Sequence, residues 1–433
     1  MDARTRAALR ERFATARGAA WAEGARDAGA GPGFAAQVDL AALFVERGLS
    51  LLHDGGTLAL LVPAKLWRAL AGGGVRRLLA RHARLCALED WSRSPPAFDA
   101  AVYPSLVVAT RGAPAPQAAD ACVAVTEHAP GTSRRWSAPA WALPLTADPA
   151  SPWPLVPPDV RGAFDLVAAA GPPLAHTPFG RPELGVKTGC NAAFVVQGDA
   201  CVADADDCMR VSAGDRHGLV ERTLLRPLVR GETLTPWRLH DTSERILWTH
   251  DALGRPLPAL PPTAHRWLRP WRARLAARSD GHGAARWWML HRTDGADHRA
   301  PRVVWSDFGR VPRAAVIAAG DPTVALNTCY VLRCPTLADA RALAALLNSA
   351  LAAAWLEPIA EPARGGYRRY LAWTMARLPL PADWPRARTL LAPMAERAEA
   401  GDAPPPDALL GAVLCAYGLA PDDVWPLLAW QCR

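Results

Sequence analysis

The stretch VDLAALFVERGLSLLHDGGTLALLVP, residues 38–63, decides the fold class. Its first half spaces apolar residues as on one face of a helix, and Gly55-Gly56 ends that helix. The run TLALLVP follows directly and is apolar on both faces, which is typical of a buried strand in a parallel sheet. A second helix over about 64–83 and the strands LCALEDW and SLVVATR continue the alternation. We therefore expect an α/β fold with part of an open, doubly wound sheet.

The rest of the chain changes character three times. Residues 113–180 are rich in proline and alanine and are predicted to form a connector with one helix. From about 181 to 335, short apolar runs alternate with Gly, Asp and Pro, which indicates an irregular, mostly-β region. Helical spacing returns after that. Four parts are expected: a sheet domain at 1–112, the connector at 113–180, a mixed α+β domain at 181–382 and C-terminal helices at 383–433.

The composition excludes several classes of protein. Half of the 433 residues are hydrophobic and 21% are charged, unlike a disordered or fibrous chain. No run reaches 18 apolar residues and the first 30 residues lack the core of a signal peptide, so membrane and secreted classes are excluded. The nine cysteines form no C-x-x-C pair. Neither a disulfide framework nor a metal site is expected, and a reducing cytoplasm is the expected compartment.

Positive charge and tryptophan gather in one segment. Residues 218–312 hold 16 arginines against nine acidic residues, a balance of +7 within a whole-chain charge of +8, and seven of the 18 tryptophans. Arginine forks bind phosphate and read guanine edges, and flat rings stack on unpaired bases. The segment therefore predicts contact with a polyanion. The alternative is that a GC-rich genome explains the arginines, which are then solvated, and that the tryptophans are core.

Three segments resemble TaqI-like adenine-N6 DNA methyltransferases. Residues 38–67 resemble the middle of the catalytic domain, although Ala41 stands where the family has tyrosine. Residues 95–112 resemble a late strand region, and LGVKTGCNAAFVV, residues 184–196, resembles the opening of the target-recognition domain. RPLVRGETLTPWRL, RWWMLHR, LLNS and the stretch from RGGYRRY to LPLP follow in the family's order. The resemblance covers about residues 35–382 and implies a partial methyltransferase-type sheet followed by a target-recognition domain.

Two elements of that family are absent. One is the Gly-rich loop that holds the methionine part of S-adenosyl-L-methionine. The other is the Asn-Pro-Pro-aromatic tetrapeptide that binds the adenine amino group, so no catalytic residue is assigned. Ser94-Pro95-Pro96-Ala97 resembles it but lacks the aromatic residue and comes too late in the chain; a simple turn is the alternative. The chain is expected to begin just after the catalytic loop, as a truncated gene model, a decayed gene or half of a split enzyme, and to leave an open sheet edge at TLALLVP.

The resemblance implies roles for residues of the first domain. Asp39 and Phe44 match the helix that borders the cofactor, with Phe44 near its adenine ring; ordinary helix core is the alternative for Phe44. Phe98 matches the aromatic side chain that stacks on the flipped-out adenine, and Tyr103 competes for that role.

The recognition domain supplies the expected DNA contacts. Lys187, Thr188, Gly189 and Asn191 match its opening turn, where Gly189 suits a positive φ and the polar side chains suit phosphates. The alternative is a tight turn that only fixes two strands. Further contacts are expected from basic and aromatic side chains: Arg226, Arg230, Trp237, Arg238, Trp288, Arg292, Arg364, Tyr367 and Arg368. Tyr367 and Arg368 lie beside Gly365-Gly366, in a segment predicted to be a mobile basic loop.

The sequence therefore predicts the C-terminal portion of a site-specific adenine-N6 DNA methyltransferase of a restriction-modification or phage-defence system. The expected partner is double-stranded DNA, with no membrane association. S-adenosyl-L-methionine is the expected cofactor of the intact enzyme, without a metal. The chain alone is expected to be inactive. The alternative is a non-catalytic DNA-recognition subunit acting with a separate N-terminal catalytic chain, and a third possibility is methylation of RNA or protein.

Overall fold

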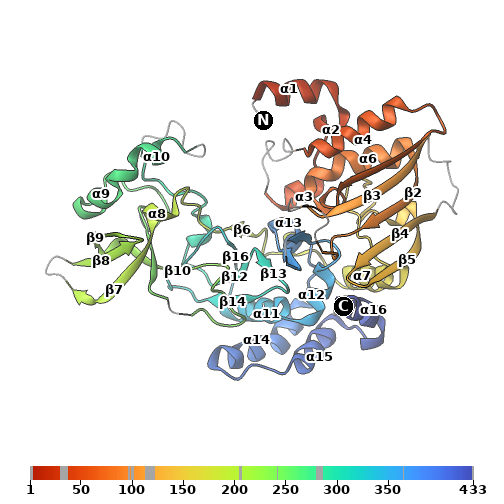
Figure 1. The fold of residues 1–433 in the computed structure, drawn as a ribbon. Coiled ribbons are helices and arrows are strands. Elements are labelled where there is room, and N and C mark those ends of the chain that lie inside the picture. The colour runs from red at the N-terminus through yellow and green to blue at the C-terminus, as the bar shows by residue number, and fades with distance from the viewer. Residues whose placement is uncertain are drawn as a thin grey trace. The chain divides into compact units, whose positions relative to one another are not determined.

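The computed structural model describes residues 3–29, 38–95, 98, 102–112, 122–203, 207–240, 242–278, 286–363 and 365–431 (Figure 1). The chain forms two compact units. The N-terminal unit comprises residues 1–177, 350–382 and 417–433, and the central unit comprises 178–349 and 383–416. This division differs from the four expected parts, because 350–382 and 417–433 pack with the first 177 residues instead of with their neighbours in sequence.

A five-stranded sheet in the order β1-β3-β2-β4-β5 organises the N-terminal unit. Its strands are β1 (Thr57–Pro63), β2 (Ala83–Asp90), β3 (Pro104–Arg111), β4 (Cys122–Ala129) and β5 (Thr132–Pro139). Strand β3 pairs antiparallel with both β1 and β2, so β1 and β2 run in the same direction with β3 between them. The β2–β4 pair is parallel and the β4–β5 pair is antiparallel. The α/β class is confirmed, with a mixed sheet.

The prediction for TLALLVP was wrong in one respect. All of β1 pairs antiparallel with β3 instead of lying inside a parallel sheet. Leu58 and Val62 are buried, whereas Leu61 is 54% exposed, so only one face of the strand is covered. An apolar run cannot by itself distinguish a strand buried on both faces from one buried on a single face. Among the described strands, β1 lies at the edge of the sheet, as expected for its open side.

The segment predicted as a connector, residues 113–180, contains more secondary structure than the one helix expected. It contains β4, β5 and the helix α7 (Pro158–Ala169). In β4 the sequence CVAVTEHA alternates, and Val123 and Val125 point into the core, as in a half-buried strand. The prolines that suggested a connector lie mainly after β5, where they do not interrupt the sheet.

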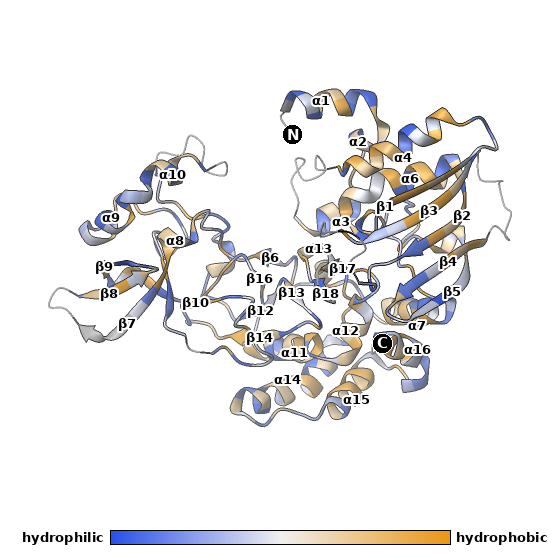
Figure 2. Cartoon of the chain, viewed as in Figure 1, coloured by the Kyte–Doolittle hydropathy of each residue, from blue (hydrophilic) through white to orange (hydrophobic). Residues whose placement is uncertain are grey.

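Helices and a hairpin complete the N-terminal unit. The helix predicted over 64–83 is two helices, because the backbone turns extended at Ala69 with ψ 147°, and Gly72 then lets the chain pass close to the Leu66 carbonyl oxygen, where a Cβ would lie 2.1 Å away. Apolar residues line the central strands β2 and β3 (Figure 2), and the rings of Trp67 and Trp153 stack in the same core with centroids 5.5 Å apart. The remaining elements are α1 (Ala3–Arg12), α2 (Ala14–Arg17), α3 (Ala22–Asp27), α4 (Leu40–Leu51), α5 (Lys65–Arg68), α6 (Gly73–His82), α12 (Ala350–Leu356), β17 (Glu361–Ala363), β18 (Tyr367–Arg369), α13 (Ala372–Ala376) and α16 (Pro421–Gln431).

The central unit confirms the predicted mixture of short strands and helices. It contains a six-stranded sheet, β15-β10-β11-β7-β8-β9, and a four-stranded sheet, β14-β12-β16-β6. The strands are β6 (Glu183–Leu184), β7 (Val195–Ala203), β8 (Cys208–Ala213), β9 (Arg216–Glu221), β10 (Leu225–Val229), β11 (Glu244–Leu247), β12 (Arg302–Ser306), β13 (Phe308–Gly309), β14 (Ala314–Ile317), β15 (Val324–Ala325) and β16 (Cys329–Arg333). The helices are α8 (Asn191–Phe194), α9 (Pro262–Leu268), α10 (Arg272–Ala276), α11 (Leu337–Leu347), α14 (Trp384–Ala400) and α15 (Pro406–Tyr417).

Across the described ranges, no single helix combines the length and the apolar composition needed to cross a membrane. Helices α11 and α12 meet those criteria only when they are counted together.

Candidate functional site

The opening turn of the central unit is held by its own side chains. Gly189 has φ +66°, as its sequence context predicted. Thr188 is buried, and its hydroxyl donates to the Asn191 side-chain oxygen at 2.6 Å and accepts from the Cys190 amide at 3.1 Å. The backbone of Lys187 pairs with that of His291. These contacts give Thr188 and Asn191 a role in fixing the turn, and their proposed phosphate contacts stay a prediction.

Arg278 secures this turn from outside it. Its guanidinium donates to the carbonyl oxygen of Thr188 and to those of Trp287 and Met289, at 2.9 and 2.7 Å for the last two. Its side chain also lies against Gly189, where a Cβ would come within 2.5 Å of the Arg278 Cδ. Sequence reasoning missed Arg278, because three backbone carbonyls that converge in space leave no pattern in the sequence.

Arg226 is a predicted DNA contact whose charge is not paired with any described carboxylate. It lies on β10, half-buried, with its guanidinium carbon 4.2 Å from the ring centroid of Trp248. Among the described residues, no carboxylate lies within ion-pair distance of it, and burial lowers the pKa of Arg226. The buried Trp248 ring was not selected from the sequence. A cation stacked on a ring keeps its five donors in a fixed plane.

Three other predicted DNA contacts already interact with residues of the central unit. Arg230 pairs with Glu244 at 3.1 Å and with Glu232 at 3.6 Å. Trp237 has a positive φ of 73°, and its amide donates to the carbonyl oxygen of Ala314 on β14. The backbone of Trp237 is therefore hydrogen-bonded to a strand of the four-stranded sheet. Arg238 is exposed and donates to the carbonyl oxygen of Glu399 at 2.9 Å.

The tryptophans of residues 218–312 serve mainly as core. Trp248, Trp267 and Trp305 are buried, and none of the other four is exposed. Trp288 donates its indole N–H to Leu257 at 3.2 Å and packs against the core. Arg292 is exposed at φ +58°. The rings therefore follow the core alternative, whereas exposed arginines agree both with the solvated alternative and with a surface for a polyanion.

A basic surface that sequence reasoning did not single out lies on α9, α10 and the short turn between them. Arg266, Arg269, Arg272 and Arg274 are all exposed there, and no ion pair to a described residue holds any of them. The signal was present, because residues 256–279 contain no acidic side chain. We call these four arginines the α9–α10 basic surface.

In the N-terminal unit, Asp39 caps helix α4. Its carboxylate accepts from the Ala41 amide at 3.0 Å and pairs with Lys65 at 2.6 Å. Burial alone would raise the pKa of Asp39, but Lys65 and the Ala41 amide outweigh it and lower that pKa. Phe44 is 70% exposed, so the core alternative for it was wrong and its ring face is available to a ligand.

One of the two predicted base-stacking residues, Tyr103, contacts the hairpin of β17 and β18. The Tyr103 hydroxyl donates to the carbonyl oxygen of Ala363 on β17 at 2.8 Å. Tyr367, on β18, is 42% exposed, and Gly365 and Gly366 turn the hairpin with φ of +81° and +76°. Phe98 is 51% exposed. Arg364 and part of the Ser94-Pro95-Pro96-Ala97 segment lie outside the described residues.

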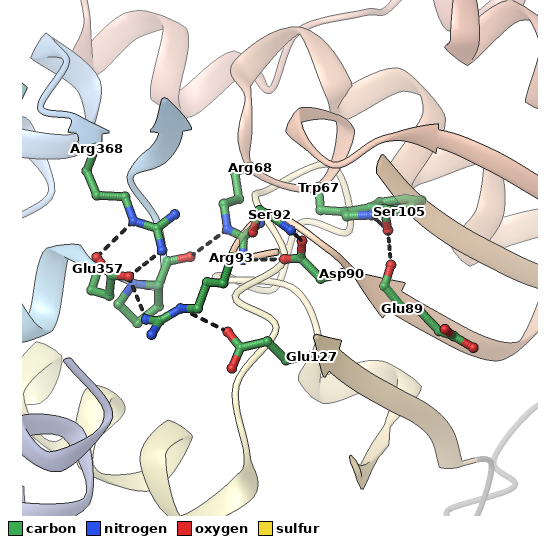
Figure 3. A network of polar contacts seen from close by, with 11 residues as sticks. Trp67, Arg68, Glu89, Asp90, Ser92, Arg93, Ser105, Glu127, Glu357 and Arg368 are labelled. Atoms are coloured by element: carbon green, nitrogen blue, oxygen red, sulfur yellow. Dashed lines mark hydrogen bonds and ion pairs between the residues drawn. The ribbon is translucent and has the colours of Figure 1, made fainter. Parts of the chain in front are cut away.

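A buried network of ion pairs fixes this hairpin to the sheet (Figure 3). Glu357 receives Arg368 Nε at 2.9 Å and Arg93 Nη2 at 2.7 Å. Arg93 also pairs with Glu127 at 3.2 Å. Because Arg368 is buried and its charge is paired with Glu357, its guanidinium serves the fold of this unit first. Its predicted DNA contact remains a prediction.

The same network continues to the end of β2. Arg68 Nη2 lies 2.8 Å from Asp90, and both side chains are almost fully buried. Burial alone would raise the pKa of Asp90, but Arg68 and the Ser92 amide outweigh it and lower that pKa. Burial of Glu127 raises the pKa of that carboxyl despite Arg93. The three arginines and three carboxylates balance in charge, which is typical of a structural cluster.

Comparisons with known proteins identify a shared fold. No protein-family model and no curated protein matches the sequence. The solved structure of the type IIL restriction-modification enzyme MmeI in complex with DNA matches all of this chain and 54% of that one, with a TM-score of 0.57 and 12% identity. The type IIG restriction endonuclease BpuSI matches 92% of this chain and 50% of that one, with a TM-score of 0.34 and 11% identity. The chain thus spans about half the length of each, and its fold resembles that of the restriction-modification enzyme MmeI.

Proposed function

We propose that the chain is the DNA-recognition part of a site-specific adenine-N6 DNA methyltransferase of a restriction-modification or phage-defence system. The central unit binds double-stranded DNA in this proposal. Two findings support it: the fold resembles MmeI, whose structure contains DNA, over the whole chain, and the central unit carries arginines without carboxylate partners.

The α9–α10 basic surface carries the proposal. Four exposed arginines within nine residues hold a local charge that no described carboxylate neutralises. Water and small ions solvate these exposed charges, and their concentration on one surface creates a positive field that attracts a polyanion. A DNA duplex is such a polyanion, with one phosphate charge about every 1.7 Å along its axis, and binding releases its condensed counterions.

The residues predicted to hold S-adenosyl-L-methionine fit that cofactor only in part. Phe44 offers an exposed ring face for an adenine, but the Asp39 carboxylate is already engaged by Lys65 and by the helix end. The sequence holds no Gly-rich loop for the methionine part and no Asn-Pro-Pro-aromatic tetrapeptide. No step of methyl transfer is derived from these residues. In the proposal, the catalytic groups come from another polypeptide segment or a separate chain.

Fluorescence anisotropy with labelled duplex DNA tests the binding. We compare the wild-type chain, a variant with Arg266, Arg269, Arg272 and Arg274 replaced by alanine, and a control. The control replaces the same number of exposed arginines on α1, namely Arg4, Arg6, Arg10 and Arg12. Affinity of the wild-type chain is expected to fall steeply with salt. The slope of log K against log salt should fall by as much as about 3.6 in the α9–α10 variant, at about 0.9 per phosphate contact.

The control on α1 distinguishes a specific binding surface from a general effect of charge. Both variants lose four charges, so a general charge effect would weaken them equally, whereas a specific surface affects only the first. Equal slopes for the two variants, or salt-independent binding of the wild-type chain, would contradict the proposal. Duplex RNA is included as a competitor, because preference for it would favour an RNA substrate. With tritiated S-adenosyl-L-methionine, the chain alone is expected to transfer no methyl group to DNA.

A further inference from the structure

A cavity of about 140 Å³ opens in the central unit next to Arg226 and Trp248. The turn 251–254 and the loop 293–299 form its other walls. An engineered protein cavity of about 150 Å³ holds one benzene molecule, so this space is too small for a whole purine and admits only the edge of a base. The cavity belongs to neither the α9–α10 basic surface nor the network of Figure 3.

Most charged side chains of the cavity are already paired. Arg299 makes two bonds with Asp297, at 2.9 and 2.7 Å. Asp251 accepts from Arg255 Nε at 2.8 Å and also from backbone amides of its own turn. Arg333, which also lines the cavity, pairs with Glu183 at 2.9 Å. These pairs hold the walls in place and leave little capacity for a ligand.

Arg226 is the exception. Among the described residues, its guanidinium has no carboxylate partner and no hydrogen-bond acceptor, and it rests on the Trp248 ring at 4.2 Å. The register of β10 and β11 explains this contact. Leu225 lies opposite Leu247, so Arg226 and Trp248 project from the same face of the pair. The ring fixes the plane of the guanidinium while its donors stay free.

The charge of the cavity selects the kind of ligand. Three arginines (Arg226, Arg299, Arg333) and three aspartates (Asp251, Asp294, Asp297) line it, so the lining is balanced. Because the lining carries no net charge, it offers a phosphodiester no net attraction to offset the cost of desolvating the phosphate. A neutral base carries no such cost, and guanine presents two neighbouring acceptors, N7 and O6, that match the two-pronged donor of arginine.

We infer that Arg226, held flat by Trp248 in the wall of this cavity, reads the N7 and O6 edge of one guanine in the recognised DNA. This inference rests on the proposed binding of duplex DNA and adds the position at which one base is identified. Asp297 and Arg299 support the site by fixing its wall, and they are positioning residues.

The first test changes the DNA and leaves the protein intact. Duplexes that bind the wild-type chain are selected from a random-sequence library. Each guanine of the selected sequence is then replaced in turn by 7-deazaguanine, which removes the N7 acceptor and keeps base pairing. We expect one guanine at which this replacement weakens binding about tenfold, and smaller effects elsewhere.

The second test changes the protein. Arg226→Met keeps the length of the side chain and removes the donors. The matched control is Arg216→Met, because Arg216 also stacks on tryptophans, at 5.0 Å from Trp267 and 4.9 Å from Trp271, but lies outside the cavity. Arg226→Met should lose discrimination at the same guanine by about 5- to 150-fold and become insensitive to its 7-deaza replacement. The control should keep the discrimination of the wild-type chain at that guanine and its sensitivity to 7-deaza replacement, whatever its overall affinity.

The outcomes separate this inference from the proposed function. If Arg226→Met weakens binding to all sequences equally and lowers the salt slope by about one, Arg226 contacts a phosphate and the inference is wrong. If no guanine responds to 7-deaza replacement in the wild-type chain, the inference is also wrong, whether or not the variant folds. If the wild-type chain binds no duplex, the proposed function fails and this inference fails with it.

Discussion

Replacing Glu357 with glutamine is expected to destabilise the N-terminal unit strongly. The Glu357 carboxylate holds two arginines at once, Arg368 at 2.9 Å and Arg93 at 2.7 Å (Figure 3). Arg368 is only 7% exposed. Burial alone would lower the pKa of Arg368, but Glu357 and Asp90 outweigh it and raise that pKa above its ordinary value. The charge of Arg368 therefore persists inside the unit and depends on Glu357.

The magnitude follows from what each arginine retains. Arg93 keeps Glu127 at 3.2 Å, so its charge remains paired. Arg368 keeps no other carboxylate within ion-pair distance among the described residues. Breaking a buried pair by removing one partner costs about 3–5 kcal/mol, and glutamine retains one acceptor for Arg368. We expect Glu357→Gln to lower the free energy of unfolding of the N-terminal unit by about 2–4 kcal/mol.

Urea unfolding followed by hydrogen–deuterium exchange mass spectrometry resolves the two units and measures this loss. The double variant Glu357→Leu/Arg368→Met removes both charges, so it should be more stable than Glu357→Gln by about 1–2 kcal/mol. A loss below about 1 kcal/mol in Glu357→Gln, or a double variant that is less stable than the single one, would refute the reasoning that charge pairing holds this cluster.

Two further changes test the central unit. Burial lowers the pKa of His250 to about 4. As the pH drops from about 6.5 towards 4, the unfolded chain therefore binds a proton at His250 that the folded chain does not bind. The free energy of unfolding should fall by about 3 kcal/mol in total over this range. Unfolding measured at pH 5 and pH 7.5 should show about 2 kcal/mol of this loss in the wild-type chain and a smaller loss in His250→Asn. Equal losses would exclude His250 as the cause. Gly189→Ala places a Cβ at φ +66° and 2.5 Å from Arg278 Cδ, whereas Gly180→Ala has a similar φ of +72° with open space around it. In urea unfolding, Gly189→Ala should cost more than the roughly 1–2 kcal/mol of the backbone alone, and equal losses in the two variants would mean that Arg278 moves aside freely.

Local patterns predicted most elements but not their pairing. The helix at α4, the strands β2 and β3 and the mostly-β character of the central unit follow from periodicity and from Gly and Pro positions. Periodicity carries no information on the partner of a strand, so β1 was expected in a parallel sheet and pairs antiparallel with β3. Strands β4 and β5 were hidden by the prolines around them, although the alternation of Val123 and Val125 was present.

The candidate site was predicted in part. Gly189 and Arg226 were selected from the sequence, but only the structure shows that no described carboxylate pairs with Arg226. The α9–α10 basic surface was inside the segment of +7 charge but was not singled out. Trp248 and Arg278 were missed, because a stacking ring and three converging carbonyls are defined by contacts between distant residues.

The sequence by itself determined the α/β class of this protein, the segment of residues 218–312 with its surplus of arginine, and the type of most of its helices and strands. Tertiary structure alone decided which arginines are free. Arg368 and Arg226 were both expected DNA contacts, yet one is neutralised by Glu357 and the other rests on Trp248 without a carboxylate partner among the described residues. The physical reason is that ion pairing depends on distances of a few ångströms between residues far apart in the chain, whereas composition and periodicity depend only on neighbours.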